Sequence, residues 1–181
     1  MRTEVPLIEK NIVLVGFMGV GKTSIGQALA KKMYRDFIDI DAKIEEKLNM
    51  SIPAIFEKHG EAFFRQHEKE AVFSACKEKL KIISLGGGAF TQEAVRQRCL
   101  ADCIVIHLDL SFECWKDRVH MLIDNRPILQ GKSMPELKQL YTVRRKAYEN
   151  YHSRFSTDAF NVEEAAEYLK ESLHLAYEIE G

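Results

Sequence analysis

Residues 16–23 carry the clearest chemical signal in this sequence. They read Gly-Phe-Met-Gly-Val-Gly-Lys-Thr and fit the pattern G-x-x-x-x-G-K-[ST] without a mismatch. Glycines let the backbone wrap tightly with its N–H groups turned inward, and a helix beginning near Lys22 adds the positive end of its dipole. We expect Lys22 to reach the β and γ phosphates of a nucleotide and Thr23 to place its hydroxyl on Mg²⁺. An unliganded glycine turn is the alternative, but the motif is complete and lies between a predicted strand and a predicted helix.

Two carboxylates end the segment DFIDID, which we predict to be a strand over 36–41. Asp39 and Asp41 are two residues apart and would share one face of a strand. If this strand lies beside the strand at 11–15, both carboxylates approach the phosphate site. One could then hold Mg²⁺ through water, and the other could orient a substrate hydroxyl for in-line attack. The alternative is that one of them caps a helix beginning near Ala42, a role that suits Asp41.

Three consecutive glycines, Gly86, Gly87 and Gly88, follow the apolar run KIISL. A tight turn between a strand and a helix would need only one or two glycines. Three are costly in backbone entropy, so the run favours close approach of a ligand to the backbone.

Arg65 lies between two acidic neighbours, Glu61 and Glu68, at helical spacing. The three could form a solvated surface network of little energetic value. Alternatively, Glu68 holds the guanidinium so that its fork can bind a carboxylate. The spacing alone leaves both interpretations open.

Further arginines lie in the second half of the chain. The stretch 119–132 contains Pro127 and Gly131, with Arg118 just before its start and Arg126 at its middle. It is an ordinary surface loop or a lid that brings Arg126 over the phosphates. Arg144 belongs to a strongly charged predicted helix, where a solvated face is the simpler interpretation.

The elements that must position these residues alternate along the chain. Short apolar strands are predicted at 11–15, 36–41, 81–85 and 103–108. Helical periodicity follows Lys22, Ser51 (a predicted N-cap) and Ser111, and covers about Glu61–Lys79, 134–151 and a last segment near Leu169. Alternating strands and helices indicate an α/β fold, a parallel sheet with helices on both faces. Ligands bind such folds at the carboxyl ends of the strands, where the glycine-rich turns would gather.

Composition narrows the class of protein. The 181 residues fit one domain, and 46% of them are apolar, which is enough for a sizeable core. A formal net charge of -1 gives no indication of a nucleic-acid or membrane partner. No stretch approaches the roughly 20 apolar residues of a membrane span. The four cysteines form no C-x-x-C pair, the histidines lack metal spacing, and His107 is expected to be a satisfied core residue. A cytoplasmic protein with reduced thiols is the default expectation.

The ordered set of motifs resembles the shikimate kinase family. The similarity runs from Asn11 to the last helix, through GFMGVGKTSIG, FIDIDAKIE, GEAFFRQHE, IISLGGGAF, NRPIL and RRKAY. It implies one P-loop kinase domain over 1–181, related to nucleoside monophosphate kinases, with three α/β/α layers and a five-stranded parallel sheet. It also implies a helical acceptor-binding segment at about 42–80 and a mobile lid at about 119–131. The implied reaction transfers the γ-phosphoryl group of ATP to the 3-hydroxyl of shikimate, with Mg²⁺, in a monomer.

The resemblance also assigns roles to individual residues. Those implied in catalysis are Lys22, Asp41 and Arg126. Those implied in nucleotide binding are Gly19, Val20, Gly21, Lys22, Thr23, Ser24, Arg118 and Arg126. Those implied in shikimate binding are Asp41, Arg65, Gly86, Gly87, Gly88 and Arg144, and those implied at the metal are Thr23 and Asp39.

The sequence departs from the family pattern at two places. The adenine-side arginine is expected seven residues before the lid arginine, but Val119 stands there and Arg118 is eight residues away. The usual R-x-P-L-Y reads Arg144-Arg145-Lys146-Ala147-Tyr148, so Arg145 rivals Arg144 for the substrate carboxylate. The alternative functions are a gluconate or nucleoside monophosphate kinase and an inactive nucleotide-binding regulatory domain.

Overall fold

The computed structural model describes residues 5–122 and 127–180. Five parallel strands form one sheet in the order β2-β3-β1-β4-β5. The strands are β1 (Ile12–Val15), β2 (Asp36–Asp39), β3 (Lys81–Ser84), β4 (Ile104–Asp109) and β5 (Ser153–Ser156). The helices are α1 (Lys22–Met33), α2 (Ile40–Leu48), α3 (Ile52–His59), α4 (Glu61–Cys76), α5 (Glu93–Asp102), α6 (Phe112–Leu122), α7 (Met134–Lys146) and α8 (Val162–Glu180), with short 3-10 turns at Leu7–Glu9, Ala89–Thr91 and Pro127–Leu129.

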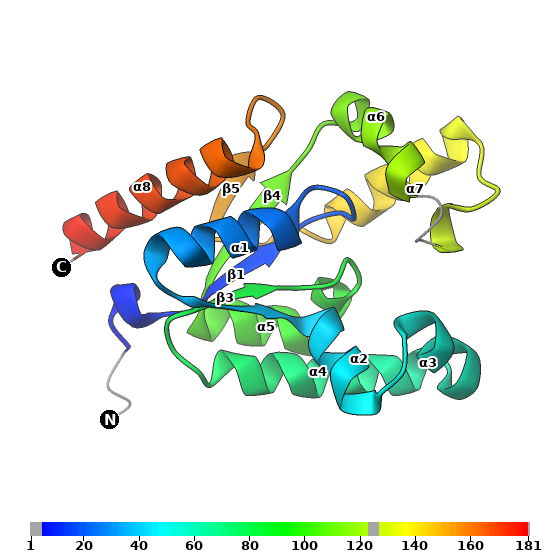
Figure 1. The fold of residues 1–181 in the computed structure, drawn as a ribbon, viewed down its shortest axis with the longest axis horizontal. Coiled ribbons are helices and arrows are strands. Elements are labelled where there is room, and N and C mark those ends of the chain that lie inside the picture. The colour runs from blue at the N-terminus through cyan, green and yellow to red at the C-terminus, as the bar shows by residue number, and fades with distance from the viewer. Residues whose placement is uncertain (1–4, 123–126, 181) are drawn as a thin grey trace.

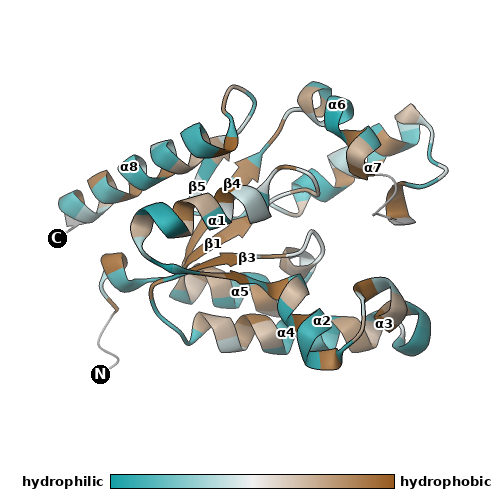
Figure 2. Ribbon diagram, viewed as in Figure 1, coloured by the Kyte–Doolittle hydropathy of each residue, from teal (hydrophilic) through white to brown (hydrophobic). Residues whose placement is uncertain are grey.

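Helices cover both faces of the sheet, as the alternating pattern predicts. Figure 1 shows α1 and α8 packed together on one face, and α4 and α5 on the other. Strand β1 lies in the middle and its four residues are fully buried. The strands β1, β3 and β4 are the most apolar part of the ribbon in Figure 2, because strands covered on both faces have no side that water can reach. The predicted three-layer α/β/α fold with a five-stranded parallel sheet is confirmed.

The second strand is shorter than predicted. It ends at Asp39, and Asp41 lies in the first turn of α2. The cap of this helix is Asp39, whose side chain accepts a hydrogen bond from the backbone N–H of Ala42 at 3.1 Å. The expectation that Asp41 suits the capping role is therefore wrong, because Asp39 stands at the cap position three residues before that N–H.

Strand β2 also does not lie beside β1, as was assumed when Asp39 and Asp41 were placed near the phosphate site. Strand β2 pairs with β3, so β3 separates it from β1. Asp39 nevertheless reaches Thr23, because both lie at the carboxyl ends of the strands.

Two helices end earlier than predicted. Helix α7 ends at Lys146, where the prediction was 151, and α4 ends at Cys76, where the prediction was about Lys79. In contrast, helix α6 extends to Leu122, so the first residues of the predicted lid, 119–122, form its last turn. Among the predicted starts, Ser51 caps α3 by accepting from the N–H of Ala54 at 3.4 Å, as expected.

The fifth strand had no signal of its own in the sequence. In β5 only Phe155 is buried, because the strand lies at the edge of the sheet. No helix among the described residues is long and apolar enough to cross a membrane.

Candidate active site

A cleft of about 900 Å³ opens where the carboxyl ends of β1, β2 and β3 meet. It brings together four of the predicted groups: the loop after β1, the carboxylates after β2, the glycines after β3, and an arginine on each of α4 and α7. Its lining includes Gly19, Lys22, Thr23, Asp39, Asp41, Arg65, Gly86, Gly87, Gly88 and Arg144. The glycine-rich turns thus share one edge, as a parallel sheet requires.

The loop at residues 16–23 has the backbone of a phosphate cradle. Gly19 and Gly21 have φ angles of 80° and 99°, which lie in the left-handed region that favours glycine. Gly21 is the N-cap residue of helix α1, so the positive end of the helix dipole directly follows the loop. The side chain of Lys22 folds over the loop and donates to the carbonyls of Gly16 and Phe17 at 2.7 and 3.1 Å.

Two predicted nucleotide-binding residues stand apart from the cleft wall. Val20 is buried, and its backbone N–H donates to the carbonyl of Phe17 at 3.4 Å, which closes the loop on itself. Ser24 is exposed on the first turn of α1 beside Thr23. Neither lines the described cleft.

Helix α6 braces the loop from behind. The buried Trp115 donates from Nε1 to the carbonyl of Met18 at 2.8 Å, and its ring packs on Phe17 with centroids 5.2 Å apart. Arg118 donates to the carbonyl of Gly19 at 3.5 Å, so it lies against the cradle and does not line the cleft. No sequence pattern pointed to Trp115, because its partner is a backbone carbonyl 97 residues away.

The metal-binding candidates lie next to each other. Thr23 Oγ1 donates to Asp39 Oδ2 at 3.0 Å, while the other oxygen of Asp39 caps α2. A hydroxyl and a carboxylate at the mouth of a phosphate cradle are the hard oxygen ligands that Mg²⁺ takes in nucleotide sites. Among the described residues, no group of three His, Cys, Asp or Glu could hold a metal ion.

Asp41 lies directly against the glycine run. A methyl group added at Gly86 would come within 2.6 Å of Asp41 Oδ1 and 2.9 Å of Oδ2. Gly86 needs no left-handed backbone, so its role here is to leave room for the carboxylate. Asp41 is half-buried and lines the cleft.

Arg65 has a similar relation to Gly88. A methyl group there would lie 2.6 Å from Nη1 and 2.7 Å from the central carbon of the guanidinium. The first and third glycines thus fit two different side chains, whereas the nearest atom to a methyl group at Gly87 is the Tyr148 hydroxyl oxygen at 3.6 Å.

A buried acid holds Arg65 in place. Arg65 Nη1 donates to Glu68 at 2.7 Å, and the same carboxylate accepts from Gln92 at 2.8 Å. The Glu68 side chain is only 1% exposed. Burial raises the pKa of Glu68, against the lowering effect of Arg65. The solvated-network interpretation fits only Glu61, which is exposed and 3.3 Å from Arg65 Nε, so Glu68 is the residue that holds the guanidinium.

The structure separates the two neighbouring arginines at the end of α7. Arg144 lines the cleft, and no ion pair joins it to another residue within the described ranges. Arg145 points elsewhere and donates to Asp109 at 2.6 Å. Of the two, Arg144 is therefore the one placed to meet an acid in the cleft.

The structure cannot place one predicted residue. Arg126 lies outside the described residues, so its position relative to the phosphate cradle stays a prediction.

Two buried residues differ from what the sequence indicated. The hydroxyl of Tyr148 donates to the carbonyl of Gly87, a contact that fixes the glycine turn and that no sequence pattern indicated. The expectation for His107 is half right: it is buried in β4, but its Nδ1 finds no hydrogen-bond partner among residues 5–122 and 127–180.

The arrangement divides the cleft into two halves with different chemistry. Backbone N–H groups and Lys22 make one half suited to a polyphosphate. Arg65 and Arg144 make the other half suited to a carboxylate, and Asp41 also lines the cleft, next to Gly86. Such a site can transfer a phosphoryl group to a hydroxyl of an acidic small molecule.

Comparison with known proteins agrees with this chemistry. The sequence model of the family described as shikimate kinase matches residues 18–174. A shikimate kinase of Bacillus subtilis is 53% identical over 97% of this chain and 95% of its own. A solved structure of the shikimate kinase from Acinetobacter baumannii in complex with shikimate has a TM-score of 0.84 at 34% identity, covering 96% of this chain and 95% of that one. A gluconokinase from Sinorhizobium meliloti shares only the fold, with a TM-score of 0.60 at 16% identity over 97% of each chain.

Proposed function

The chain belongs to the shikimate kinase family, and on this premise we propose that it transfers the γ-phosphoryl group of ATP to the 3-hydroxyl of shikimate. The observation that carries the proposal is the single cleft lined both by the phosphate cradle and by Arg65, Arg144 and Asp41. Shikimate has one carboxylate for the arginines and hydroxyls for the aspartate. The product, shikimate 3-phosphate, leads to chorismate and the aromatic amino acids.

The donor half binds and orders ATP. The backbone N–H groups of Gly19 and Gly21 surround the phosphates, and Lys22 leaves its carbonyl partners to neutralise the β and γ groups. Thr23 and Asp39 are the residues that would hold Mg²⁺. When bound, that ion would neutralise negative charge on the phosphates.

The acceptor half positions the nucleophile. Arg65, held by Glu68, and Arg144 bind the carboxylate of shikimate from α4 and α7. Asp41 accepts a hydrogen bond from the reacting hydroxyl and orients its oxygen toward the γ phosphate. The glycines of 86–88 bring the backbone close enough for these side chains to converge.

The remaining assignments extend the same proposal. Arg126 is the arginine of a lid that closes over the phosphates, and Arg118 contacts the adenine side of the nucleotide. The hydrogen bond from Arg118 to the carbonyl of Gly19 supports a place for it beside the nucleotide. Closure excludes water, so that ATP is not lost to hydrolysis. We also assign the protein to the cytoplasm, as a monomer; its free cysteines support the first of these assignments.

A coupled assay of ADP release tests the proposal. With ATP and Mg²⁺, we expect rapid ADP release only when shikimate is present, and one shikimate 3-phosphate formed per ADP. Gluconate and the nucleoside monophosphates serve as matched acceptors. Turnover of either without turnover of shikimate would replace our acceptor, and tight ATP binding with no acceptor at all would favour an inactive regulatory domain.

A further inference from the structure

A second cavity, of about 310 Å³, lies beside the end of α7 and against β4 and β5. Within residues 5–122 and 127–180, none lines both this cavity and the active-site cleft. Its volume is at the lower end of the range for small-molecule sites. The residues that give it chemical character are His107, Arg145, Lys146, Glu149, Tyr151 and Arg154.

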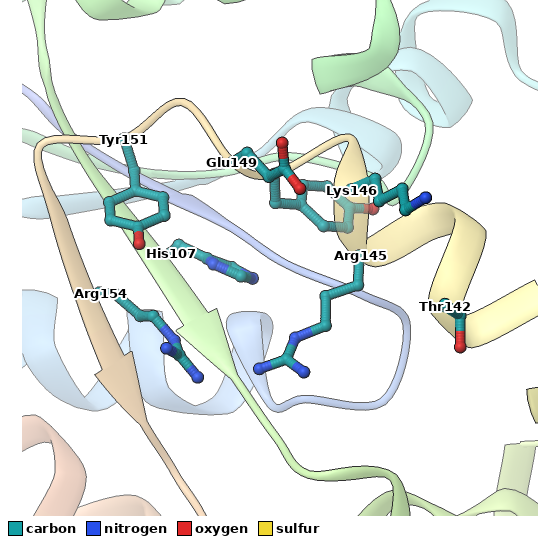
Figure 3. A pocket seen from close by; sticks show the side chains of 8 residues that line it. His107, Thr142, Arg145, Lys146, Glu149, Tyr151 and Arg154 are labelled. Atoms are coloured by element: carbon teal, nitrogen blue, oxygen red, sulfur yellow. The ribbon is translucent and has the colours of Figure 1, made fainter.

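Cations from two elements converge on this cavity. Figure 3 shows the guanidinium groups of Arg145 and Arg154 turned toward each other below the ring of His107. Both donate to one oxygen of the buried Asp109, Arg145 at 2.6 Å and Arg154 from Nε at 3.0 Å. Asp109 thus holds the two guanidinium groups at fixed positions.

These two arginines keep donors to spare. Their side chains remain 43% and 48% exposed, and a guanidinium has five N–H donors, of which Asp109 takes only one or two from each. Lys146 adds a third cation, and Glu149 is the carboxylate among the lining residues. One buried aspartate and one rim glutamate face three cations, so the cavity carries a net positive charge.

Aromatic rings supply the other surfaces. His107 is 4% exposed, and its ring lies 5.5 Å from the ring of Tyr148 and 5.5 Å from that of Tyr151. Burial lowers the pKa of His107 to about 4, so the ring is neutral at physiological pH. Its Nδ1 has no hydrogen-bond partner in the described chain. An orphaned polar atom beneath a positively charged, aromatic-walled cavity indicates a site whose hydrogen bonding the protein does not complete by itself.

We propose that this cavity binds a small ring-bearing carboxylate, distinct from the substrates of the active-site cleft. The carboxylate would take the spare donors of Arg145 and Arg154, and the flat ring would pack against His107 and Tyr151. Inorganic phosphate and simple aliphatic acids share the anionic group but leave the aromatic walls unused. The proposal does not depend on which acceptor the active site phosphorylates.

The test uses His107 as its own reporter. Its imidazole proton resonance in the NMR spectrum is assigned as the one missing from His107→Gln, and the exposed His174 on α8 serves as an internal reference. The full-length protein, with its active-site cleft filled by ADP and shikimate, is titrated with benzoate, acetate and inorganic phosphate in turn. We expect a saturable shift of the His107 resonance with benzoate, with a dissociation constant on the order of 1 mM, and at least tenfold weaker effects of acetate and phosphate.

Matched variants locate the binding. Lys146→Gln leaves the Asp109 pair intact and should weaken benzoate binding several-fold, whereas Lys138→Gln, the same change on the same helix outside the cavity, should not. Arg154→Gln should weaken it at least tenfold, with Arg96→Gln as its control. An unmoved His107 resonance at about 50 mM benzoate, or equal binding to all four variants, would overturn the proposal. Phosphate binding more tightly than benzoate would overturn its ring-bearing part. Repeating the titration without ADP and shikimate separates this result from any failure of the proposed kinase reaction.

Discussion

Adding a single methyl group to each glycine of the run 86–88 in turn should show that the first and third glycines serve different functions. The changes are Gly86→Ala, Gly87→Ala and Gly88→Ala. None of the three glycines has a left-handed backbone, so alanine is allowed at each by conformation. A methyl group at Gly86 comes within 2.6 Å of Asp41, one at Gly88 comes within 2.6 Å of Arg65, and one at Gly87 meets nothing closer than 3.6 Å.

The distances set the size of the effects. Ordinary contact begins at 3.4 Å, so the side chain facing a methyl group at Gly86 or Gly88 must retreat by almost 1 Å. In each case the displaced atoms are the far end of a side chain, so folding tolerates the shift. Catalysis does not, because a misplacement of about 1 Å can cost on the order of a hundredfold. We expect Gly88→Ala to raise the KM for shikimate about tenfold or more, and Gly86→Ala to lower kcat about tenfold or more with less effect on KM.

Gly87→Ala is the matched control in the same turn. It should keep kcat and both KM values within about twofold, and it should gain up to about 1 kcal/mol of stability because alanine restricts the unfolded chain. Steady-state kinetics with each substrate varied, and thermal unfolding of all three variants, give the measurements. If Gly87→Ala is as damaging as its neighbours, or if Gly88→Ala leaves the KM for shikimate unchanged, the glycines are not there to make room for Asp41 and Arg65.

Three further predictions concern single side chains. Asp41→Asn should lower kcat about a hundredfold or more while ATP binding measured by calorimetry stays nearly intact, and surviving turnover would refute its role with the hydroxyl. Arg65→Ala should raise the KM for shikimate at least about tenfold and that for ATP little, because it removes charge-assisted hydrogen bonds to the acid; equal effects on both would make it structural. The free energy of unfolding should fall by up to about 3 kcal/mol as the pH drops from 6.5 to 4, because burial lowers the pKa of His107 from 6.5 to about 4 and the unfolded chain takes up its proton first. Denaturant unfolding across this range should show a shallower loss for His107→Gln, and parallel curves would contradict the burial argument.

The sequence could predict those parts of the site whose residues are close together in the chain. The phosphate cradle is one continuous segment, so its glycines, Lys22 and Thr23 could be assigned from spacing alone. The end of β2 could not be predicted in this way. The alternation of apolar and acidic residues in DFIDID fits a strand that continues to residue 41, and it fits equally well a helix that begins after an acidic cap. Only the hydrogen bond from the N–H of Ala42 to Asp39 decides between them.

Other features depended on contacts between distant residues. Strand β5 has a polar, exposed sequence because it pairs on one side only, so no apolar run marks it. Glu68 looks like a surface residue by its type, and its burial follows from Gln92 and Arg65 closing around it. The unsatisfied nitrogen of His107 could not be predicted either, because the lack of a hydrogen-bond partner depends on which distant residues pack around the ring.

The neighbouring arginines at the end of α7 show how a remote residue settles a local ambiguity. Consecutive residues on a helix point about 100° apart, so Arg144 and Arg145 face different surroundings although the sequence treats them alike. Asp109, at the end of β4, is buried and binds the guanidinium groups of both Arg145 and Arg154. Arg145 is therefore held on the β4 side, which leaves Arg144 turned into the cleft. The choice of Arg144 over Arg145 as the candidate for the substrate acid therefore rests on a contact with an aspartate 36 residues earlier in the chain, which the local sequence does not reveal.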